Sequence, residues 1–123
     1  MIISRTPLRV SFAGGGSDLP DFFKKNEGAV VSTTIDKYIY IALHPNFHTD
    51  RLLLKYIKTE EVNNPRKLEN NIARAILSDL KINGLEISSS GDMPSQTGLG
   101  SSSAFAVSLY HALQAYLGKK AFP

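Results

Sequence analysis

The segment that most limits how this chain can fold is a tight turn joined directly to a helix. Residues 94–104 read Pro-Ser-Gln-Thr-Gly-Leu-Gly-Ser-Ser-Ser-Ala, and an apolar stretch follows at once. Gly98 and Gly100 let the backbone turn sharply and come close to a ligand, because they carry no Cβ. The serines at 101–103 stand where a helix begins, and the first amides of a helix lack partners within it. The pattern therefore predicts a helix whose first turn is open to an outside group.

The chemistry of this turn favours an anion. Free N–H groups, serine hydroxyls and the positive end of the helix dipole would converge on one point, which suits a phosphate. Two known phosphate loops fit less well, because no lysine follows Gly100 and Ser103 replaces the third glycine of a dinucleotide fingerprint. The hydrolase pattern Gly-x-Ser-x-Gly is absent. We interpret the segment as a nucleotide-phosphate loop, and a glycine turn with a serine N-cap is the alternative.

A second glycine-rich segment lies near the start of the chain. Residues 6–20 read Thr-Pro-Leu-Arg-Val-Ser-Phe-Ala-Gly-Gly-Gly-Ser-Asp-Leu-Pro. Residues 7–13 alternate apolar and polar side chains, which predicts a strand with Arg9 on its polar face. The carboxylate of Asp18 could accept hydrogen bonds from sugar hydroxyls, and the glycines let the backbone lie against a ligand. A structural bend with Asp18 as an N-cap is the alternative. The apolar face of this strand would hold Leu8, Val10 and Phe12.

Turn residues and apolar periodicity divide the rest of the chain into further elements. We expect a short helix at 19–25, opened by Asp18 or Pro20, then strands at 29–43, 51–57 and 85–89, and helices at 64–80 and 101–117. The strand at 29–43 could bend near Asp36, and 51–57 could be its hairpin partner. The two longer helices would bury Leu68, Ile72, Ala75, Ile76 and Leu80, and Ala106, Leu109, Tyr110, Leu113 and Tyr116, with Gly118 as a C-cap. This mixture predicts an α+β fold.

Composition excludes several classes of protein. The chain has 123 residues, 42% hydrophobic and 20% charged, which is typical of one globular unit. It has no cysteine, so disulfides and thiolate chemistry are excluded and a reducing cytoplasm is the expected location. The start does not read as a signal peptide, and no apolar run is long enough to span a membrane. The net charge of +3 comes from scattered residues, which does not favour nucleic acid as a partner.

Together, the two glycine-rich segments resemble the first and second signature motifs of the GHMP small-molecule kinases. The sequence of residues 8–20 is most similar to the corresponding motif of the sugar kinases that include D-glycero-D-manno-heptose 7-phosphate kinase and fucokinase. Residues 35–38 and 90–94 also look like this subgroup, whereas Gly14–Gly16 departs from the Gly-Glu-His pattern of galactokinases. The resemblance implies a two-layer sheet-and-helix N-terminal lobe of the ribosomal-protein-like kind, with residues 1–123 as an incomplete part of a longer protein.

The resemblance also implies roles for particular residues. It implies ATP and Mg²⁺ as cofactors, a sugar or sugar phosphate as acceptor, and phosphoryl transfer from the first to the second. The nucleotide would be bound by Pro94, Thr97, Gly98, Leu99, Gly100, Ser101, Ser102 and Ser103, and Ser102 would help hold the metal. The acceptor would be bound by Gly14, Gly15, Gly16, Ser17 and Asp18. Arg9 would lie near the transferred phosphoryl group or steady the catalytic aspartate, which would lie beyond Pro123.

The other candidate residues carry weaker signals. His44 and His48 are four residues apart, but Pro45 lies between them, so a turn is favoured over a metal site. For His111 we expect a packed histidine. The rings of Tyr38, Tyr40 and Phe47 could stack on a base, but a place in the core on a face of the sheet is favoured. Asp36 and Asp92 are interpreted as turn or cap residues, and Lys37 as an exposed lysine of a strand.

Two rival functions remain open at this point. A basic α/β module that binds RNA would need clustered Lys and Arg beside exposed aromatic rings on one sheet face. A unit that only folds or forms a homodimer would be inert by itself. If the kinase interpretation holds, this chain alone should lack activity because the catalytic carboxylate lies elsewhere.

Overall fold

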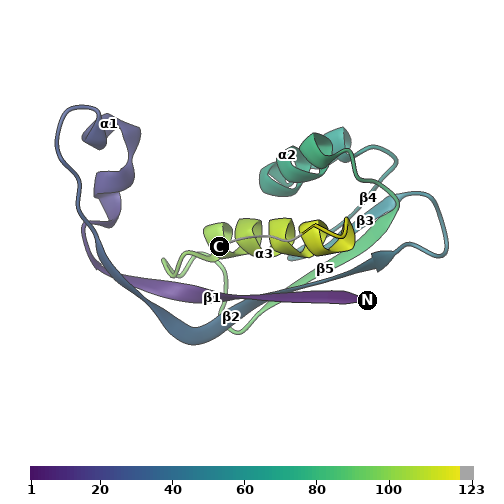
Figure 1. Cartoon of the computed structure of the whole chain (residues 1–123), viewed down its shortest axis with the longest axis horizontal. Coiled ribbons are helices and arrows are strands. Elements are labelled where there is room, and N and C mark those ends of the chain that lie inside the picture. Colours follow the sequence, from purple (N-terminus) through teal and green to yellow (C-terminus); the bar gives the residue numbers. More distant parts are fainter. Residues whose placement is uncertain (120–123) are drawn as a thin grey trace.

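A five-stranded sheet with two helices packed on one face forms the body of the molecule (Figure 1). The computed structural model describes residues 1–119. Strand order across the sheet is β1-β2-β5-β3-β4. The strands are β1 (Ile2–Ala13), β2 (Val31–Pro45), β3 (Leu52–Lys55), β4 (Thr59–Val62) and β5 (Leu85–Gly91). The helices are η1 (Gly15–Asp18), α1 (Pro20–Phe23), η2 (Pro65–Lys67), α2 (Asn71–Leu80) and α3 (Ser101–Tyr116). The expected two-layer α+β fold is confirmed.

The pairing of the strands differs from the expected hairpin. β3 pairs antiparallel with β4 and parallel with β5, so β5 separates it from β2. The prediction that residues 51–57 pair with the preceding strand was therefore wrong. The true partner, β4, was missed because its sequence Thr-Glu-Glu-Val carries two acidic residues and lacks an apolar alternation.

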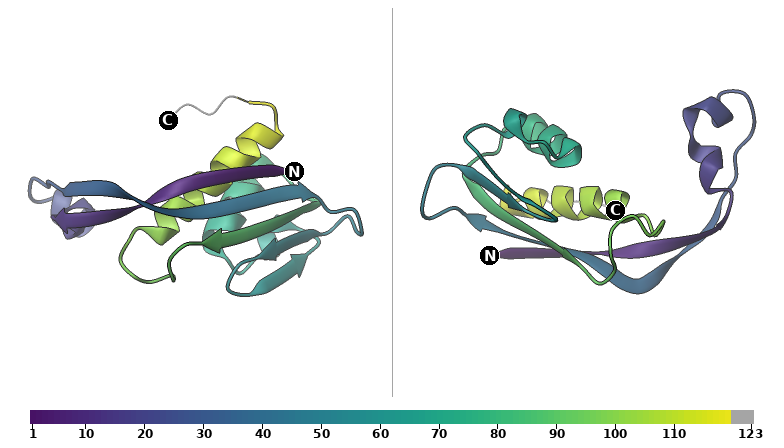
Figure 2. Two further views of the ribbon diagram at one scale, coloured as in Figure 1. Left: turned by 90° about the horizontal axis from the view of Figure 1, so that it is seen from below. Right: turned by 180° about the vertical axis from the view of Figure 1, so that it is seen from behind.

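The long strand β2 carries an irregularity that bends it, as expected near Asp36. Pro7 lies opposite Tyr38 and Arg9 opposite Thr34, so Leu8 alone faces the three residues that lie between Thr34 and Tyr38. A bulge of this kind bends a ribbon and increases its twist. Beyond the bulge, β1 and β2 continue as a two-stranded ribbon that carries α1 at its far end, away from α2 and α3 (Figures 1 and 2).

Within the described residues, α2 and α3 do not cover the ribbon beyond Arg9 (Figure 1). Phe12 is 68% exposed, so the apolar face expected for residues 7–13 is buried only at Leu8. The short helix expected at 19–25 is present as α1 with Pro20 in its first turn, where the fixed φ of proline suits a helix start. Neither η1 nor α1 contains a buried residue.

The main core lies between the sheet and the helices α2 and α3. Strand residues facing the helices alternate with residues facing away, as a pleated strand requires. The buried members of this core are Ile41, Leu43, Leu52, Leu54, Leu68, Ala73, Leu77, Ile82, Leu85, Ile87, Phe105, Leu109, Ala112 and Leu113. A smaller cluster of Leu8, Ile39 and Ala104 lies nearer the start of α3.

The helix expected at 64–80 is broken in the structure. Pro65–Lys67 forms a 3-10 turn, Leu68 is extended, and α2 begins only at Asn71, with the Asn70 side chain as its cap. The face of α2 was also partly wrong, because Ala73 and Leu77 are buried whereas Ala75 is exposed. The extended backbone of Leu68 ends the turn that Asn64 caps, and Asn70 caps a new helix start.

Helix α3 has nearly the expected bounds, but the face that it buries differs from the expected face. Tyr110 and Tyr116 are 47% and 41% exposed, and His111 is exposed, so the packed histidine was wrong. The polar Ser108 is buried instead, because the Ser4 hydroxyl lies 2.6 Å from both its carbonyl and its hydroxyl oxygen. Gly118 follows the helix with a φ of 71°, in keeping with the expected C-cap.

Replacing one buried residue of α3 tests this packing. Leu109 is fully buried, so Leu109→Ala should lower the free energy of unfolding by about 2–5 kcal/mol, measured by urea denaturation. Val107 lies two residues away and is 57% exposed, so Val107→Ala should change that free energy by less than about 0.5 kcal/mol. Equal losses in the two variants would contradict the packing described here.

Candidate functional site

The loop from Asp92 to Gly100 joins β5 to α3 and has an unusual backbone. Gln96, Gly98 and Gly100 have φ values of 64°, 74° and 74°, in the left-handed region. Gly100 occupies the N-cap position of α3 and provides no side-chain cap. The serine N-cap that we considered as the alternative is therefore not formed, and the first amides of α3 keep their capacity to bind an outside acceptor.

Arg9 lies directly against the start of α3. Its backbone N–H donates to the carbonyl oxygen of Leu99 at 3.0 Å. A Cβ placed on Gly100 would lie 3.1 Å from Cγ and 3.3 Å from Nε of Arg9, which is a tight contact, and the φ of 74° at this position also favours glycine. The structure thus brings together Arg9 and Gly100, two predicted site residues that are distant in the sequence.

Asp92 fastens the other end of the loop to β2. Its carboxylate accepts from the backbone N–H of Tyr38 at 2.9 Å and from the Tyr40 hydroxyl at 3.5 Å, and its own N–H donates to the Tyr38 carbonyl at 3.0 Å. Burial and the nearby Asp92 carboxylate raise the pKa of Tyr40. Asp92 is thus more than the turn residue we expected, because it ties the loop to a strand 54 residues away.

The smaller core cluster lies beneath the loop. Leu8, Ile39 and Ala104 are buried together, and Met93 and Leu99 of the loop pack against them. The loop therefore has an apolar support as well as hydrogen bonds at both ends. A support of this kind fixes the position of a backbone that is meant to bind without rearrangement.

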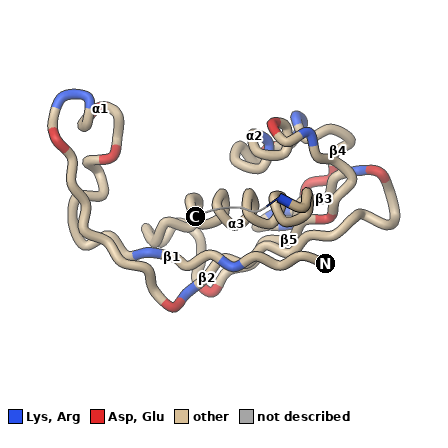
Figure 3. The backbone as a smooth tube through the Cα atoms, in the orientation of Figure 1, with Lys and Arg blue, Asp and Glu red and all other residues tan. Residues whose placement is uncertain are grey.

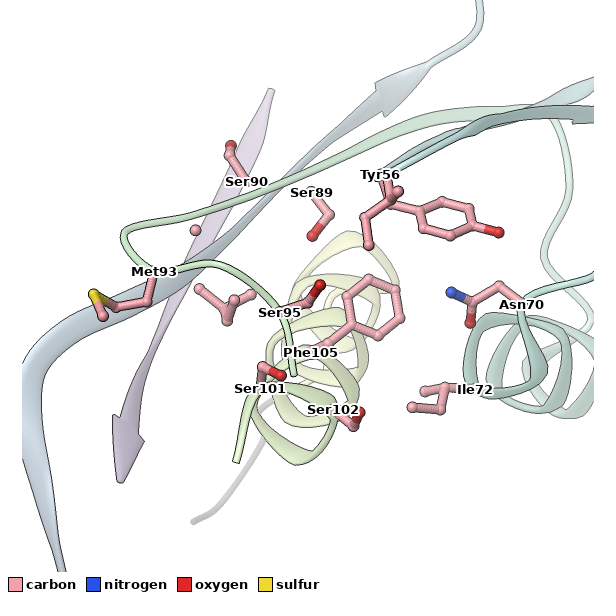
Figure 4. A pocket seen from close by; sticks show the side chains of 13 residues that line it. Tyr56, Asn70, Ile72, Ser89, Ser90, Met93, Ser95, Ser101, Ser102 and Phe105 are labelled. Atoms are coloured by element: carbon pink, nitrogen blue, oxygen red, sulfur yellow. The ribbon is translucent and has the colours of Figure 1, made fainter. Parts of the chain in front are cut away.

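A pocket of about 240 Å³ opens beside the start of α3 (Figure 4). Its lining comes from β2, the end of β5, the loop, the β3–β4 turn and the first turns of α2 and α3. The residues are Ile39, Tyr56, Ile57, Asn70, Ile72, Ser89, Ser90, Gly91, Met93, Ser95, Ser101, Ser102 and Phe105. Apolar side chains make up one part of the wall and serine hydroxyls the other. This arrangement suits a ligand with a flat apolar ring and a polar or anionic tail.

Of the predicted nucleotide residues, Ser101 and Ser102 line this pocket. Tyr56, Asn70 and Phe105 also line it and were missed by the sequence analysis. The Asn70-Asn71 pair could have indicated a helix cap, but nothing local in the sequence places it near α3. The prediction missed these residues because the pocket forms only when three separate segments meet.

A buried carboxylate organises one wall of the pocket. Glu60 accepts from the Tyr56 hydroxyl at 2.7 Å, from the Glu69 N–H at 2.6 Å and from the Asn70 N–H at 3.2 Å. Burial raises the pKa of Tyr56 to about 12, and its hydrogen bond to Glu60 acts in the same direction. The Tyr56 phenol thus stays protonated at neutral pH and donates to the carboxylate.

The glycine-rich segment after β1 lies on the far ribbon and does not line the pocket. Gly14 has a φ of 81° and packs so closely on Ala29 that a Cβ would collide with the Ala29 carbonyl. The Ser17 hydroxyl donates to the carbonyls of Gly14 and Ala29 at 2.7 and 2.9 Å, so it closes this turn. Asp18 is exposed and does not cap α1, whose N-cap is Leu19.

The structure also places the residues whose signals in the sequence were weaker. Within residues 1–119, no three His, Cys, Asp or Glu side chains are grouped as a metal site would need. His44 stacks on Phe47 with ring centroids 5.9 Å apart. The expectation that Phe47 and the two tyrosines of β2 pack in the core was wrong, since Phe47 is 80% exposed and the tyrosines lie on the open face of the sheet, alternating with core residues such as Ile39. Lys37 is exposed, as expected.

The comparisons with known proteins agree with this arrangement. Residues 66–121 match the model of the GHMP kinases N terminal domain, and nearly the whole chain aligns with one curated relative. The expected resemblance to the GHMP kinases is thus confirmed for this part of the chain. That relative is the D-glycero-alpha-D-manno-heptose 7-phosphate kinase of Campylobacter jejuni, 30% identical over 94% of this chain and 38% of the relative.

Solved structures of a heptose phosphate kinase and a mevalonate kinase share the fold. A D-glycero-D-manno-heptose 1-phosphate kinase from Bacteriodes thetaiotaomicron has a TM-score of 0.79 at 24% identity, covering 96% of this chain and 42% of that protein. The mevalonate kinase of Methanococcus jannaschii has a TM-score of 0.74 at 21% identity, covering 98% of this chain and 42% of that protein. The chain thus spans about two fifths of the length of these relatives. In the described residues, no helix combines the length and apolar character of a membrane span.

Removing the carboxylate that fastens the loop tests its role. Asp92→Ala should speed hydrogen exchange of the amides at 92–100 by about tenfold, because it removes one charge-assisted hydrogen bond. The measurement is exchange of the intact chain followed by NMR or mass spectrometry. Asp36→Ala, an exposed aspartate at the bulge of β2, serves as the control and should leave that exchange unchanged. Unchanged exchange in Asp92→Ala would show that the loop is held without this carboxylate.

Proposed function

We propose that this chain binds ATP for a GHMP sugar kinase that phosphorylates a hydroxyl of a sugar or sugar phosphate. The observation that carries the proposal is the uncapped start of α3, which opens beside a pocket with an apolar wall. A nucleotide needs both parts, since its base is flat and apolar and its phosphates are anionic. The named relative, a heptose 7-phosphate kinase, favours a heptose phosphate as the acceptor.

The triphosphate would lie against the loop from Gly98 to Ser103. Free amides at the start of a helix and its dipole attract phosphate oxygens, and positive φ values turn the loop around them. Pro94, Thr97 and Leu99 would shape this loop; Thr97 donates from its hydroxyl to the Pro94 carbonyl at 3.2 Å. Phosphoryl transfer asks a protein mainly for such positioning and charge stabilisation.

Magnesium fits the chemistry of this end of the pocket. The Ser102 hydroxyl is an oxygen ligand beside the expected phosphates, and Mg²⁺ in such sites takes few protein ligands and several phosphate or water oxygens. When bound, the ion would neutralise charge on the phosphates. The guanidinium of Arg9 lies next to Gly100, so it adds a fixed positive charge near the same phosphates.

The acceptor would be bound by the segment from Gly14 to Asp18. Asp18 offers an exposed carboxylate that can accept hydrogen bonds from sugar hydroxyls. The turn that carries it is held by the Ser17 hydroxyl, which fixes the direction of the backbone. The acceptor oxygen would then attack the γ-phosphorus, the bond to the β-phosphate oxygen would break, and ADP would leave.

The RNA-binding alternative gains little from the structure. The open face of the sheet does carry Tyr38 and Tyr40, and the Arg5 guanidinium lies 4.4 Å from the centre of the Tyr38 ring. The Asp92 carboxylate, however, contacts both tyrosines and opposes an RNA backbone. Basic and acidic residues are interspersed along the described trace outside residues 93–118, which carry no Lys, Arg, Asp or Glu (Figure 3). We therefore favour the nucleotide.

Removing one serine hydroxyl tests the metal contact. Wild-type chain should bind ATP more tightly with Mg²⁺ than with EDTA, as measured by isothermal titration calorimetry. In Ser102→Ala this gain should fall by about tenfold, because one oxygen ligand is lost. Ser32→Ala, an exposed serine of β2, is the control and should keep the full gain. A full gain in Ser102→Ala would refute the proposed metal contact.

A second substitution tests the acceptor segment. Heptose 7-phosphate should shift the amide resonances of residues 14–18 in an NMR titration of the chain. Asp18→Ala should weaken this binding by about fivefold, because a charge-assisted hydrogen bond is lost. Asp21→Ala removes an equally exposed carboxylate from the neighbouring helix α1 and should have no such effect. If both variants bind like the wild type, the acceptor does not contact Asp18.

A further inference from the structure

The segment from Ser17 to Gly28 is fixed at both ends, at the far end of the β1–β2 ribbon. The Ser17 hydroxyl donates to the Ala29 carbonyl at 2.9 Å. A Cβ placed on Gly28 would lie 2.6 Å from the Ser17 carbonyl oxygen, so the two ends of the segment pack directly on each other. Asp18 and α1 lie between these ends, and they are therefore held in a defined position before any ligand binds.

Two exposed lysines follow α1 directly. The backbone N–H of Lys24 donates to the Pro20 carbonyl at 3.2 Å, and that of Lys25 donates to the Phe22 carbonyl at 3.1 Å. Both residues therefore continue the last turn of α1, with Lys24 as its C-cap. Figure 3 shows this basic stretch at the outer end of α1, away from the sheet.

The ammonium groups of these lysines have no anionic partner within residues 1–119. Asp21 lies three and four residues before them, a spacing at which helical side chains can pair, yet it forms no ion pair with either. The nearby Asp18 and Glu27 do not pair with Lys24 or Lys25 either. Two adjacent ammonium groups attract an anion, and a phosphate monoester carries about −1.5 to −2 charges at neutral pH.

The order of the charged residues fits an elongated acceptor. Arg9 lies beside Gly100 of the phosphate loop, Asp18 follows on the outer ribbon, and the lysines lie at the outer end of α1. Helix α1 is on the same side of the sheet as α3 (Figures 1 and 2). An acceptor whose reacting hydroxyl lies near Arg9 and whose other hydroxyls bind Asp18 would therefore extend toward the lysines.

The surface between Asp18 and the lysines is apolar. Leu19, Phe22 and Phe23 are exposed, and α1 buries no residue in the core of this chain. Its four residues span about 6 Å along the helix axis, which is similar to the width of a sugar ring. The surface thus offers a carboxylate for hydroxyl groups, an apolar face for the C–H side of a ring, and ammonium groups for a phosphate.

We propose that Lys24 and Lys25 bind the phosphate group of a sugar phosphate acceptor, so that this chain selects a phosphorylated sugar over the free sugar. The inference rests on the proposed function, because it extends the acceptor segment from Gly14–Asp18 to the end of α1. It names the class of the acceptor and adds two residues that determine specificity.

A pair of ligands that differ only in the phosphate tests the selection. NMR titrations of the chain would use D-glycero-D-manno-heptose 7-phosphate and the same heptose without phosphate. The wild type should bind the 7-phosphate about tenfold more tightly, because charge-assisted hydrogen bonds to the phosphate are added. The 7-phosphate should also shift the amide resonances of residues 24–26, which the free heptose should leave in place. Equal affinities for the two ligands would overturn the inference.

Substitution of both lysines assigns the preference to their charges. In Lys24→Gln with Lys25→Gln the preference should fall below about twofold, while the affinity for free heptose stays unchanged. Lys24→Arg with Lys25→Arg keeps both charges and should keep at least about half of the preference. A preference that survives the double glutamine substitution would overturn the inference.

The matched control removes two charges elsewhere. Arg66→Gln with Lys67→Gln alters an exposed basic pair of η2 and lowers the net charge by the same amount. This variant should keep the full preference for the 7-phosphate. An equal loss in the control and in the lysine variant would show that the overall charge attracts the phosphate, and would also overturn the inference.

The free heptose and inorganic phosphate separate this inference from the proposed function. If neither heptose nor its 7-phosphate shifts the amides of residues 14–18, the proposed acceptor segment and the inference both fail. If the two sugars bind there equally well, only the inference fails. Inorganic phosphate should bind about tenfold more weakly than heptose 7-phosphate, because it lacks the contacts of the sugar with Asp18 and α1. Equal binding of inorganic phosphate would show that the sugar is not recognised, and would overturn both.

Discussion

The packing of Leu8 beneath the β5–α3 loop is the contact on which the candidate site depends. Leu8 stands at the bulge of the β1–β2 ribbon and is buried with Ile39 and Ala104. Loop residues Met93 and Leu99 rest on that cluster, and the next residue of β1 binds the loop backbone. One buried side chain thus links the first strand, the loop and the first turn of α3. The same position brings the Arg9 side chain against Gly100.

Much of the local structure could be predicted from the sequence. The bounds of α3, its glycine cap and the strand at β5 follow from patterns carried by neighbouring residues. The loop before α3 was recognised because glycines permit a tight turn and serines favour the start of a helix. Where two local signals competed, the prediction was wrong: Asn64 and Asn70 both cap helical turns, and only the second begins α2.

The features that the sequence could not reveal all depend on distant contacts. Glu60 looks like an exposed acidic residue, yet the amides of the turn before α2 and the Tyr56 hydroxyl make its burial favourable. The parallel pairing of β3 with β5 joins segments whose order in the chain does not indicate it. The pocket could not be predicted either, since its wall combines residues from β3–β4, α2 and α3.

The bulge in β2 also limits which changes of chain length this fold can accept. Side chains of a strand alternate between its two faces, so each residue gained or lost shifts all that follow by one place. An insertion or deletion of one residue between Thr34 and Tyr38 would turn Ile39 and Ile41 outward and bring the two tyrosines under the helices. Related chains should therefore vary in length on the outer ribbon, and keep this stretch constant.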